Sequence, residues 1–184
     1  MSKNKKFPIR TLCQAALLIA LEVVLNRFCS INTMALKIGL SFLPMVLCAL
    51  LFGPWWAAGS YALADFIGAM LFPIGPYHPG FTVCAGLMGM VYGLFLYKKP
   101  ESKKKAFLNI LCATLINTLI LGLCVNTAWV AQLYGSKTYA GWFAYRLMEY
   151  AVLVPLHLIL VPVMQKLADL LRSAGIAGNG RKIK

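Results

Sequence analysis

The chain is organised as long apolar stretches separated by short polar or basic segments. The tract from Ile38 to Phe72 carries no charge before Asp65. As a single helix it would be roughly 52 Å long at 1.5 Å per residue, against a hydrocarbon core of about 30 Å. Proline lacks an amide donor and disfavours helix in the residue before it, so Gly53-Pro54 interrupts the tract. We therefore predict two helices that fold back on each other at Gly53-Pro54.

The same pattern predicts six helices along the whole chain. Residues 73–80 hold three prolines and two glycines and are expected to connect two helices. Residues 98–105 are polar and basic, and residues 132–138 form a short loop. The expected helices span residues of about 9–26, 38–53, 54–72, 81–97, 106–129 and 139–171, within a single membrane domain of residues 1–184. The last helix is longer than a bilayer, so it should project from the membrane or bend near Pro155 and Pro162.

Composition supports a membrane-embedded chain. Of 184 residues, 60% are hydrophobic and only 12% are charged. This is more apolar surface than a soluble domain of that size needs for its core, and lipid is the natural surrounding for the excess. The net charge of +13 would suggest nucleic acid in a soluble protein, but the basic residues gather at the ends of apolar runs. We therefore predict an all-α integral membrane protein with no nucleic-acid partner.

The basic residues also predict an orientation. With six spans, the N-terminal segment, residues 98–105 and the C-terminal segment share one side and carry fourteen of the eighteen lysines and arginines. The other side or its helix ends keep only Arg27, Lys37, Lys137 and Arg146. Basic residues are concentrated in the cytoplasm in membrane proteins. The expected fold is a six-transmembrane-helix bundle with both termini cytoplasmic.

Sequence signatures of catalysis are missing where a membrane enzyme would need them. The sequence has no H-E-x-x-H metal motif, no G-x-S-x-G nucleophile and no G-x-x-x-x-G-K-[ST] phosphate loop. The two histidines, His78 and His157, are far apart along the chain and more typical of loop or bundle residues than of metal ligands. We predict no catalytic residue, metal or cofactor. An ATP-driven machine would use this chain only as a subunit.

Charged side chains at membrane depth are the most informative residues. Each is costly unless it faces the bundle interior or a water-filled cavity. Those within or at the ends of the predicted helices are Glu22, Arg27, Lys37, Asp65, Arg146 and Glu149. One interpretation is that the buried ones pair with one another and only hold the bundle together. Arg146 and Glu149, three residues apart on one helix face and roughly 10 and 15 Å below its outer start, instead favour a mixed-charge pocket open to the outside.

Aromatic residues near that depth have two interpretations. They are Tyr77, Phe81, Trp129, Tyr139, Trp142 and Tyr145. In the first, they stack on a flat ligand ring. In the second, they belong to the aromatic belts that membrane proteins have at the two bilayer interfaces. The sequence pattern alone favours the second interpretation.

Small residues recur at four-residue spacing, which lets helices approach closely in lipid. The stripes are Ala16 and Ala20; Ala58 and Ala62; Ala64 and Gly68; and Ala85, Gly89 and Gly93. Most should serve packing inside the bundle. A stripe on an outward face would be a docking surface for another membrane subunit.

Several segments together resemble one known family. They are Ala16-Leu17-Leu18-Ile19-Ala20, residues 25–31, residues 38–44, Leu51-Phe52-Gly53-Pro54, residues 62–65 with 71–73, His78-Pro79-Gly80-Phe81-Thr82, and residues 92–99. In order and spacing the chain resembles the substrate-binding S component of energy-coupling factor (ECF) vitamin transporters, and within them it is most similar to the folate-specific group. The resemblance covers roughly the first hundred residues.

The resemblance implies a fold, a location and partners. Such S components are six-helix bundles of the bacterial cell membrane with cytoplasmic termini, and they topple in the membrane to carry a vitamin inward. Two cytoplasmic ATPase subunits drive the complex. The stripe on the first helix faces a separate transmembrane coupling subunit, so Ala16 and Ala20 are expected to form that partner interface.

The expected ligand is folate or a related pterin, taken from the outside. Folate has a flat ring with donor and acceptor groups on its edge, and a tail with two carboxylates. Arg27 and Lys37 are expected to bind the carboxylates, whereas Glu149 or Asp65 would accept hydrogen bonds from the ring. The full expected substrate-binding set is Arg27, Lys37, Asp65, Tyr77, Phe81, Arg146 and Glu149.

The sequence leaves alternatives open. The folate group tends to place a Lys-Glu pair just after the arginine of the last helix, whereas here Arg146-Leu147-Met148 precedes Glu149, and Lys37 stands where an arginine is expected. Another water-soluble vitamin or a purine-like compound therefore remains an alternative ligand. Outside transport, the alternatives are an intramembrane enzyme using Asp65, Arg146 and Glu149 as acid and base, and a structural subunit without a ligand.

Overall fold

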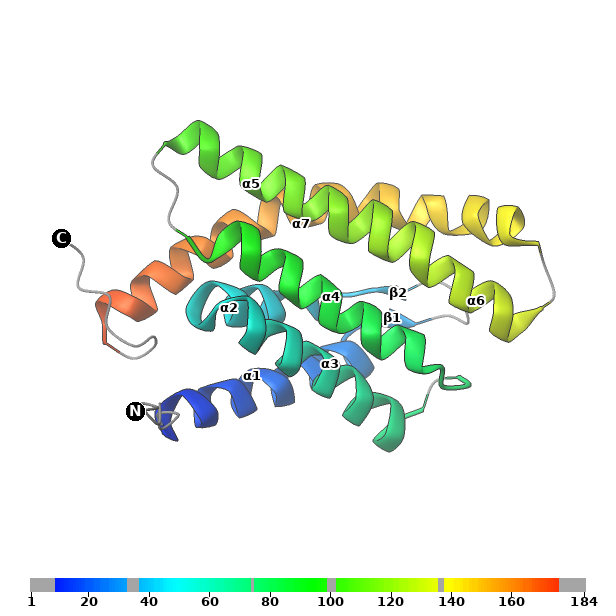
Figure 1. Ribbon diagram of the computed structural model, residues 1–184, viewed down its shortest axis with the longest axis horizontal. Coiled ribbons are helices and arrows are strands. Elements are labelled where there is room, and N and C mark those ends of the chain that lie inside the picture. Colours follow the sequence, from blue (N-terminus) through cyan, green and yellow to red (C-terminus); the bar gives the residue numbers. More distant parts are fainter. Residues whose placement is uncertain (1–8, 33–36, 74, 99–101, 136–137, 176–184) are drawn as a thin grey trace, which may run out of the picture.

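The protein is described here from a computed structural model, which describes residues 9–32, 37–73, 75–98, 102–135 and 138–175 (Figure 1). Nearly all of these residues are helical. The elements in chain order are α1 (Ile9–Arg27), β1 (Ile31–Asn32), β2 (Lys37–Ile38), α2 (Phe42–Phe52), α3 (Pro54–Leu71), α4 (Pro79–Leu96), α5 (Lys103–Leu115), the π-helix η1 (Ile116–Val125), α6 (Asn126–Tyr134) and α7 (Tyr139–Ser173). α5, η1 and α6 form one continuous helical rod from Lys103 to Tyr134.

Within the described residues, four helices are long and apolar enough to cross a membrane. They are α1, α4, the rod from Lys103 to Tyr134, and α7. The helix expected at residues 38–53 is shorter than predicted, because β2 pairs with β1 in an antiparallel ribbon and α2 begins only at Phe42. Pro44 lies in the first turn of α2, where its missing amide donor costs nothing. With 11 residues, α2 is about 17 Å long.

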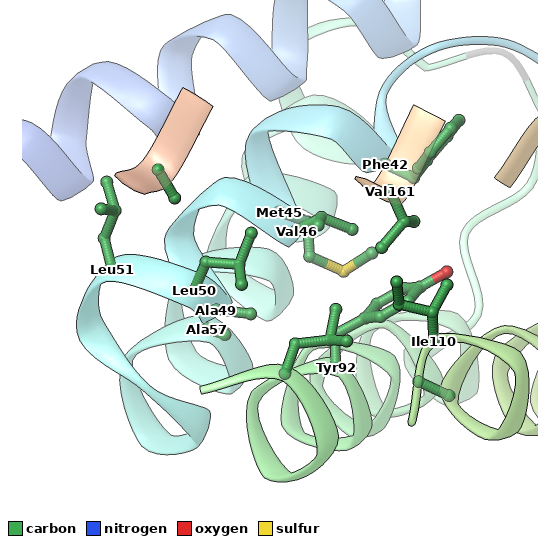
Figure 2. Packing of buried hydrophobic residues seen from close by; sticks show 13 residues of the cluster. Phe42, Met45, Val46, Ala49, Leu50, Leu51, Ala57, Tyr92, Ile110 and Val161 are labelled. Atoms are coloured by element: carbon green, nitrogen blue, oxygen red, sulfur yellow. The ribbon is translucent and has the colours of Figure 1, made fainter. Parts of the chain in front are cut away.

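α2 lies at the centre of the bundle. Val46 and Ala49 are fully buried, and they pack in one hydrophobic cluster with Tyr92 of α4, Ile110 of α5 and Val161 of α7 (Figure 2). The short helix therefore gives the longer helices a common apolar surface.

The break at Gly53-Pro54 is where the pattern predicts it. Gly53 has a φ of 93°, a conformation that glycine adopts at little cost, and Pro54 begins α3. The reversed helix α3 then packs closely against α4. A Cβ at Gly89 would lie 2.5 Å from the Ala57 carbonyl oxygen, and one at Gly93 would overlap the Pro54 backbone. The small residues of α4 therefore serve packing inside the bundle.

Other helix boundaries differ modestly from the expected ones. α4 begins at Pro79 rather than residue 81, because the Nδ1 atom of His78 accepts a hydrogen bond from the Gly80 amide (3.0 Å) and caps the helix. The rod extends beyond the expected residues 106–129 and takes up part of the predicted loop at 132–138. It ends at Gly135, whose φ of 52° is the left-handed conformation common after a helix.

α7 is 35 residues long and encloses Pro155 and Pro162. Figure 1 shows that it changes direction along its middle. Each proline removes one backbone hydrogen bond and crowds the preceding turn, which bends a helix. Of the two outcomes expected for this long segment, the structure shows the bend.

Basic residues gather at one end of the bundle. In Figure 1 the start of α1, the end of α4, the start of α5 and the end of α7 lie at one end of the bundle, and the end of α3, the end of α6 and the start of α7 lie toward the opposite end, as does the β1–β2 ribbon. Arg10 Nη1 donates a hydrogen bond to the Gly175 carbonyl (3.3 Å), which joins the beginning and the end of the described chain. The exposed Lys103, Lys104 and Lys105 therefore share an end with Arg10 and Arg172.

Candidate functional site

A cavity of about 310 Å³ opens among the helices at the ribbon end of the bundle. Its rim includes the end of α1, the residues between β2 and α2, and the α3–α4 connection. Six of the seven residues expected to bind substrate line it: Arg27, Asp65, Tyr77, Phe81, Arg146 and Glu149. The fold thus gathers side chains from four helices and a loop around a space of the size that small-molecule sites use.

The seventh expected residue, Lys37, belongs to β2 beside the rim, and its side chain lies outside the described part of the structure. The buried acid Glu22 does not line the cavity. It lies on α1 at 2% exposure and accepts a hydrogen bond from Asn26 Nδ2 (2.7 Å). Of Glu22 and Asp65, which the sequence also allowed to be purely structural, only Asp65 lines the cavity.

Arg146 and Glu149 form a buried ion pair on the inner face of α7. Arg146 Nε lies 3.4 Å from Glu149 Oε2. Arg146 Nη1 donates to Thr127 Oγ1 (3.2 Å), and Nη2 donates to the Tyr150 hydroxyl (3.0 Å). Every guanidinium nitrogen thus has a protein partner, which offsets the cost of burying the charge. Both residues line the cavity, and the ion pair holds the Glu149 carboxylate in place.

Asp65 is tied to the loop above it. Thr82 Oγ1 donates to Asp65 Oδ2 (2.8 Å) and lies 3.0 Å from the Tyr77 hydroxyl, which is therefore the donor in that second bond. The Tyr77 ring also meets Phe66 edge-on, with 6.1 Å between ring centroids. The chain of contacts fixes the α3–α4 connection over α3 and engages one Asp65 oxygen.

Arg27 stands at the mouth of the cavity, at the last residue of α1. Its guanidinium lies against Gly68 of α3, where an added Cβ would come within 2.9 Å of Nε and 3.2 Å of Nη2. The Nε atom is buried and has no hydrogen-bond partner among the described residues. Gly68 therefore leaves space for the Arg27 guanidinium, and the Nε–H of that group remains available to an acceptor on a ligand.

The aromatic residues divide into two groups. Tyr77 and Phe81 line the cavity. The other four candidates contact protein groups elsewhere: Trp129 stacks on His78 (4.9 Å between centroids), the Tyr139 hydroxyl donates to the Cys124 carbonyl (3.1 Å), and Trp142 meets Tyr145 edge-on (6.2 Å). Only two of the six aromatics are placed to contact a ligand ring in this cavity.

Sequence reasoning missed most of the uncharged polar lining. It comprises Ser41, Tyr61, Tyr92, Asn117, Thr118, Asn126, Tyr134, Tyr150 and His157. The two asparagines were detectable, because an amide within an apolar membrane segment is costly unless it faces a partner or a cavity. The π-helix η1 that carries Asn117 and Thr118 has no comparable sequence signal. Such wide turns occur often at functional sites.

Comparisons with known proteins place the chain beside membrane transporters. The family described as "ECF transporter, substrate-specific component" matches residues 10–165. The chain is 36% identical over 161 residues to a protein named folate transporter FolT from Clostridium novyi, covering 88% of this chain and 91% of that one. A FolT of Streptococcus mutans is 26% identical over 181 residues, covering 95% and 97%.

One solved structure is similar over nearly its whole length. It is described as the crystal structure of FolT bound with folic acid, and it superposes with a TM-score of 0.78 at 33% sequence identity. The match covers 87% of this chain and 94% of that one.

Proposed function

Because the chain belongs to the family of substrate-specific components of ECF transporters, we propose that it binds folate or a related pterin from outside the cell for import. It is a multi-pass protein of the bacterial cell membrane. As a member of this family it is a transport component, not an enzyme, which sets aside the intramembrane-enzyme alternative.

The observation that carries the proposal is the composition of the cavity. One cavity contains a cation at its mouth, Arg27, a carboxylate held by an arginine, Glu149, and several aromatic rings that include the expected Tyr77 and Phe81. Folate has the matching parts, with two carboxylates at one end and a flat ring with N–H donors at the other. A protein of the same fold is described as bound with folic acid, which supports the assignment.

The contacts suggest a role for each expected residue. Arg27 at the mouth, with Lys37 of the adjoining β2, would take the ligand carboxylates through charge-assisted hydrogen bonds. Glu149 would accept the ring donors, and Arg146 would position it. Asp65 is the alternative acceptor, since each acid has one oxygen bound by a protein donor, Thr82 at Asp65 and Arg146 at Glu149. Tyr77 and Phe81 would flank the ring.

The proposed topology is a single domain of six membrane helices, with the rod from Lys103 to Tyr134 counted as one and both termini in the cytoplasm. The basic residues at the α1-start and α7-end side of the bundle support this orientation. The cavity lies at the opposite end, so it would open to the outside. α2 is too short to span a bilayer alone, and the β1–β2 ribbon would complete its crossing.

The proposed partners are a transmembrane coupling subunit and two cytoplasmic ATPase subunits, since the sequence has no nucleotide-binding loop of its own. Ala16 and Ala20 are exposed on α1, whereas the neighbouring Ala15 is buried. An outward stripe of small residues permits close helix contact with another membrane subunit. This supports the partner interface at Ala16 and Ala20.

Calorimetric titration of the purified full-length chain tests the ligand assignment. We expect saturable binding of folate, reduced folate or pterin at micromolar or lower concentration. Thiamine and guanine serve as controls for another vitamin and for a purine-like ring. Absence of binding by every folate and pterin, or tighter binding of either control, would overturn the assignment. Mass spectrometry of ligand extracted from the purified protein gives an independent identification.

A further inference from the structure

The cavity has a floor that differs chemically from its mouth. Phe42, Met45 and Tyr92 line the cavity and also belong to the central hydrophobic cluster. The cavity therefore ends where the apolar core begins. His157 lies on the same face of α7 as Glu149, two turns and about 12 Å farther along the helix, and it also lines the cavity.

The His157 ring is held in one orientation. Its Nδ1 atom lies 2.7 Å from the Leu153 carbonyl oxygen, and because a carbonyl only accepts, Nδ1 carries the proton. The ring stacks on Phe42 with 3.7 Å between centroids and an interplanar angle of 23°. In the neutral ring, Nε2 then keeps a lone pair and is the ring nitrogen able to accept a hydrogen bond from a ligand. His157 is a fixed hydrogen-bond acceptor.

Asn117 of η1 offers a second acceptor. Its Nδ2 donates to the Met88 carbonyl (3.2 Å), which fixes the orientation of the amide. Its Oδ1 is buried and has no hydrogen-bond partner within the described chain, although Asn117 lines the cavity at only 4% exposure. A buried acceptor without a partner is costly, and a ligand donor would remove that cost.

We infer that His157 and Asn117 form an uncharged acceptor subsite at the cavity floor that selects flat heterocycles carrying an amino group on their leading edge. The inference rests on the proposed function and adds to it a second set of ring contacts. A pterin edge presents an amino group with two hydrogens beside a ring N–H. A carboxylate such as Glu149 pairs with the ring N–H and one amino hydrogen, which leaves the other amino hydrogen in need of an acceptor.

The two uncharged acceptors would share that one remaining hydrogen in a bifurcated hydrogen bond. They would also disfavour a ring with a carbonyl in place of the amino group, because the carbonyl oxygen would then face the acceptor atoms of His157 and Asn117 without a hydrogen between them. Lumazine differs from pterin by this replacement and is therefore a suitable probe. A site that hydrogen-bonds a specific donor rejects analogues lacking it far more strongly than an apolar pocket rejects a change in size.

The test is the ratio of the dissociation constants of lumazine and pterin, measured by ligand fluorescence on the purified chain. We expect His157→Phe and Asn117→Leu each to lower this ratio, and the double substitution to lower it on the order of tenfold, the effect of losing one buried hydrogen bond. His157→Phe keeps an aromatic ring on Phe42. His157→Gln keeps an acceptor near the Nε2 position, so this variant should retain most of the wild-type ratio of dissociation constants. The matched control, Ile159→Phe on the exposed face of α7, should leave it unchanged.

The outcomes separate this inference from the proposed function. If the wild-type chain binds folate and pterin but neither floor substitution changes the ratio, the floor subsite is wrong and the folate assignment stands. An equal loss of affinity for both rings, accompanied by a lower melting temperature without ligand, would also overturn the subsite, since it indicates a packing role. If the wild-type chain binds neither folate nor pterin, both proposals fail.

Discussion

Arg146 Nε lies 3.4 Å from Glu149 Oε2 in the interior of the protein, and the other two nitrogens of the same guanidinium are bound by Thr127 and Tyr150. Both residues line the cavity, but all three guanidinium nitrogens of the arginine already have protein acceptors. Arg146 is better described as the residue that positions Glu149 than as a partner for the ligand carboxylates. The distinction leads to a test that separates binding from folding.

Arg146→Ala should give a folded protein with weaker folate affinity. Removing one member of a buried charge pair typically costs about 2–5 kcal/mol, so we expect at least about a 30-fold loss. The melting temperature should also fall, because the Glu149 carboxylate loses its charged partner. Adding Glu149→Gln removes that charge and should recover the melting temperature without recovering the affinity. An unchanged dissociation constant in Arg146→Ala would contradict this role.

Gly68→Ala should weaken folate binding without harming the fold. The added Cβ would meet the Arg27 guanidinium, a flexible group that is able to move aside and leave the mouth of the cavity. We expect a loss on the order of tenfold for folate, equivalent to one charge-assisted hydrogen bond, and little change for pterin, which has no carboxylates.

Gly59→Ala is the matched control on the same helix, because a Cβ there meets nothing within 4 Å. It should leave both affinities unchanged and raise the free energy of unfolding by up to about 1 kcal/mol through helix propensity. Equal losses of folate and pterin affinity in Gly68→Ala would place Arg27 in a role other than carboxylate binding.

Ala16→Trp and Ala20→Trp should leave the isolated chain folded and able to bind ligand, since both side chains are exposed. A bulky ring there would prevent close contact with a coupling subunit. Co-purification with the coupling and ATPase subunits, and uptake of labelled folate by cells, should both fail. Val152→Trp, on the exposed face of α7, provides the control. Normal assembly and uptake by the Ala16 and Ala20 variants would refute the docking surface.

Gly89→Ala should destabilise the protein through the α3–α4 contact. Its Cβ would lie 2.5 Å from the Ala57 carbonyl oxygen, so the two helices must separate. Overpacking of this kind costs about 1–3 kcal/mol, and thermal unfolding in detergent should show a lower melting temperature. Gly86→Ala on the same helix should be far milder, because its Cβ would meet Ala62 at an ordinary 3.4 Å. Equal melting temperatures for the two variants would show that this contact adapts.

Much of the helical framework was predictable from the sequence, because membrane segments follow simple physical constraints. Uninterrupted apolar runs must be helical in lipid, where backbone groups have no water to bind. Gly53-Pro54 and the three prolines of residues 73–80 mark breaks that no continuous helix tolerates. Charged residues within the runs must avoid lipid, which singled out Asp65, Arg146 and Glu149 as interior residues before their neighbours were known.

Only the tertiary structure decided whether each of these interior residues lines the cavity or contacts another side chain. Membrane helices are apolar around much of their circumference, so the pattern does not indicate that Asp65 faces the cavity while Glu22 pairs with Asn26. The central place of α2 and the wide turns of η1 depend on packing among distant segments. The sequence therefore marked Asn117 as costly in lipid, but it did not indicate that Asn117 lines the same cavity as His157. The sequence determined which side chains had to avoid lipid, and the packing of the bundle determined what they contact instead.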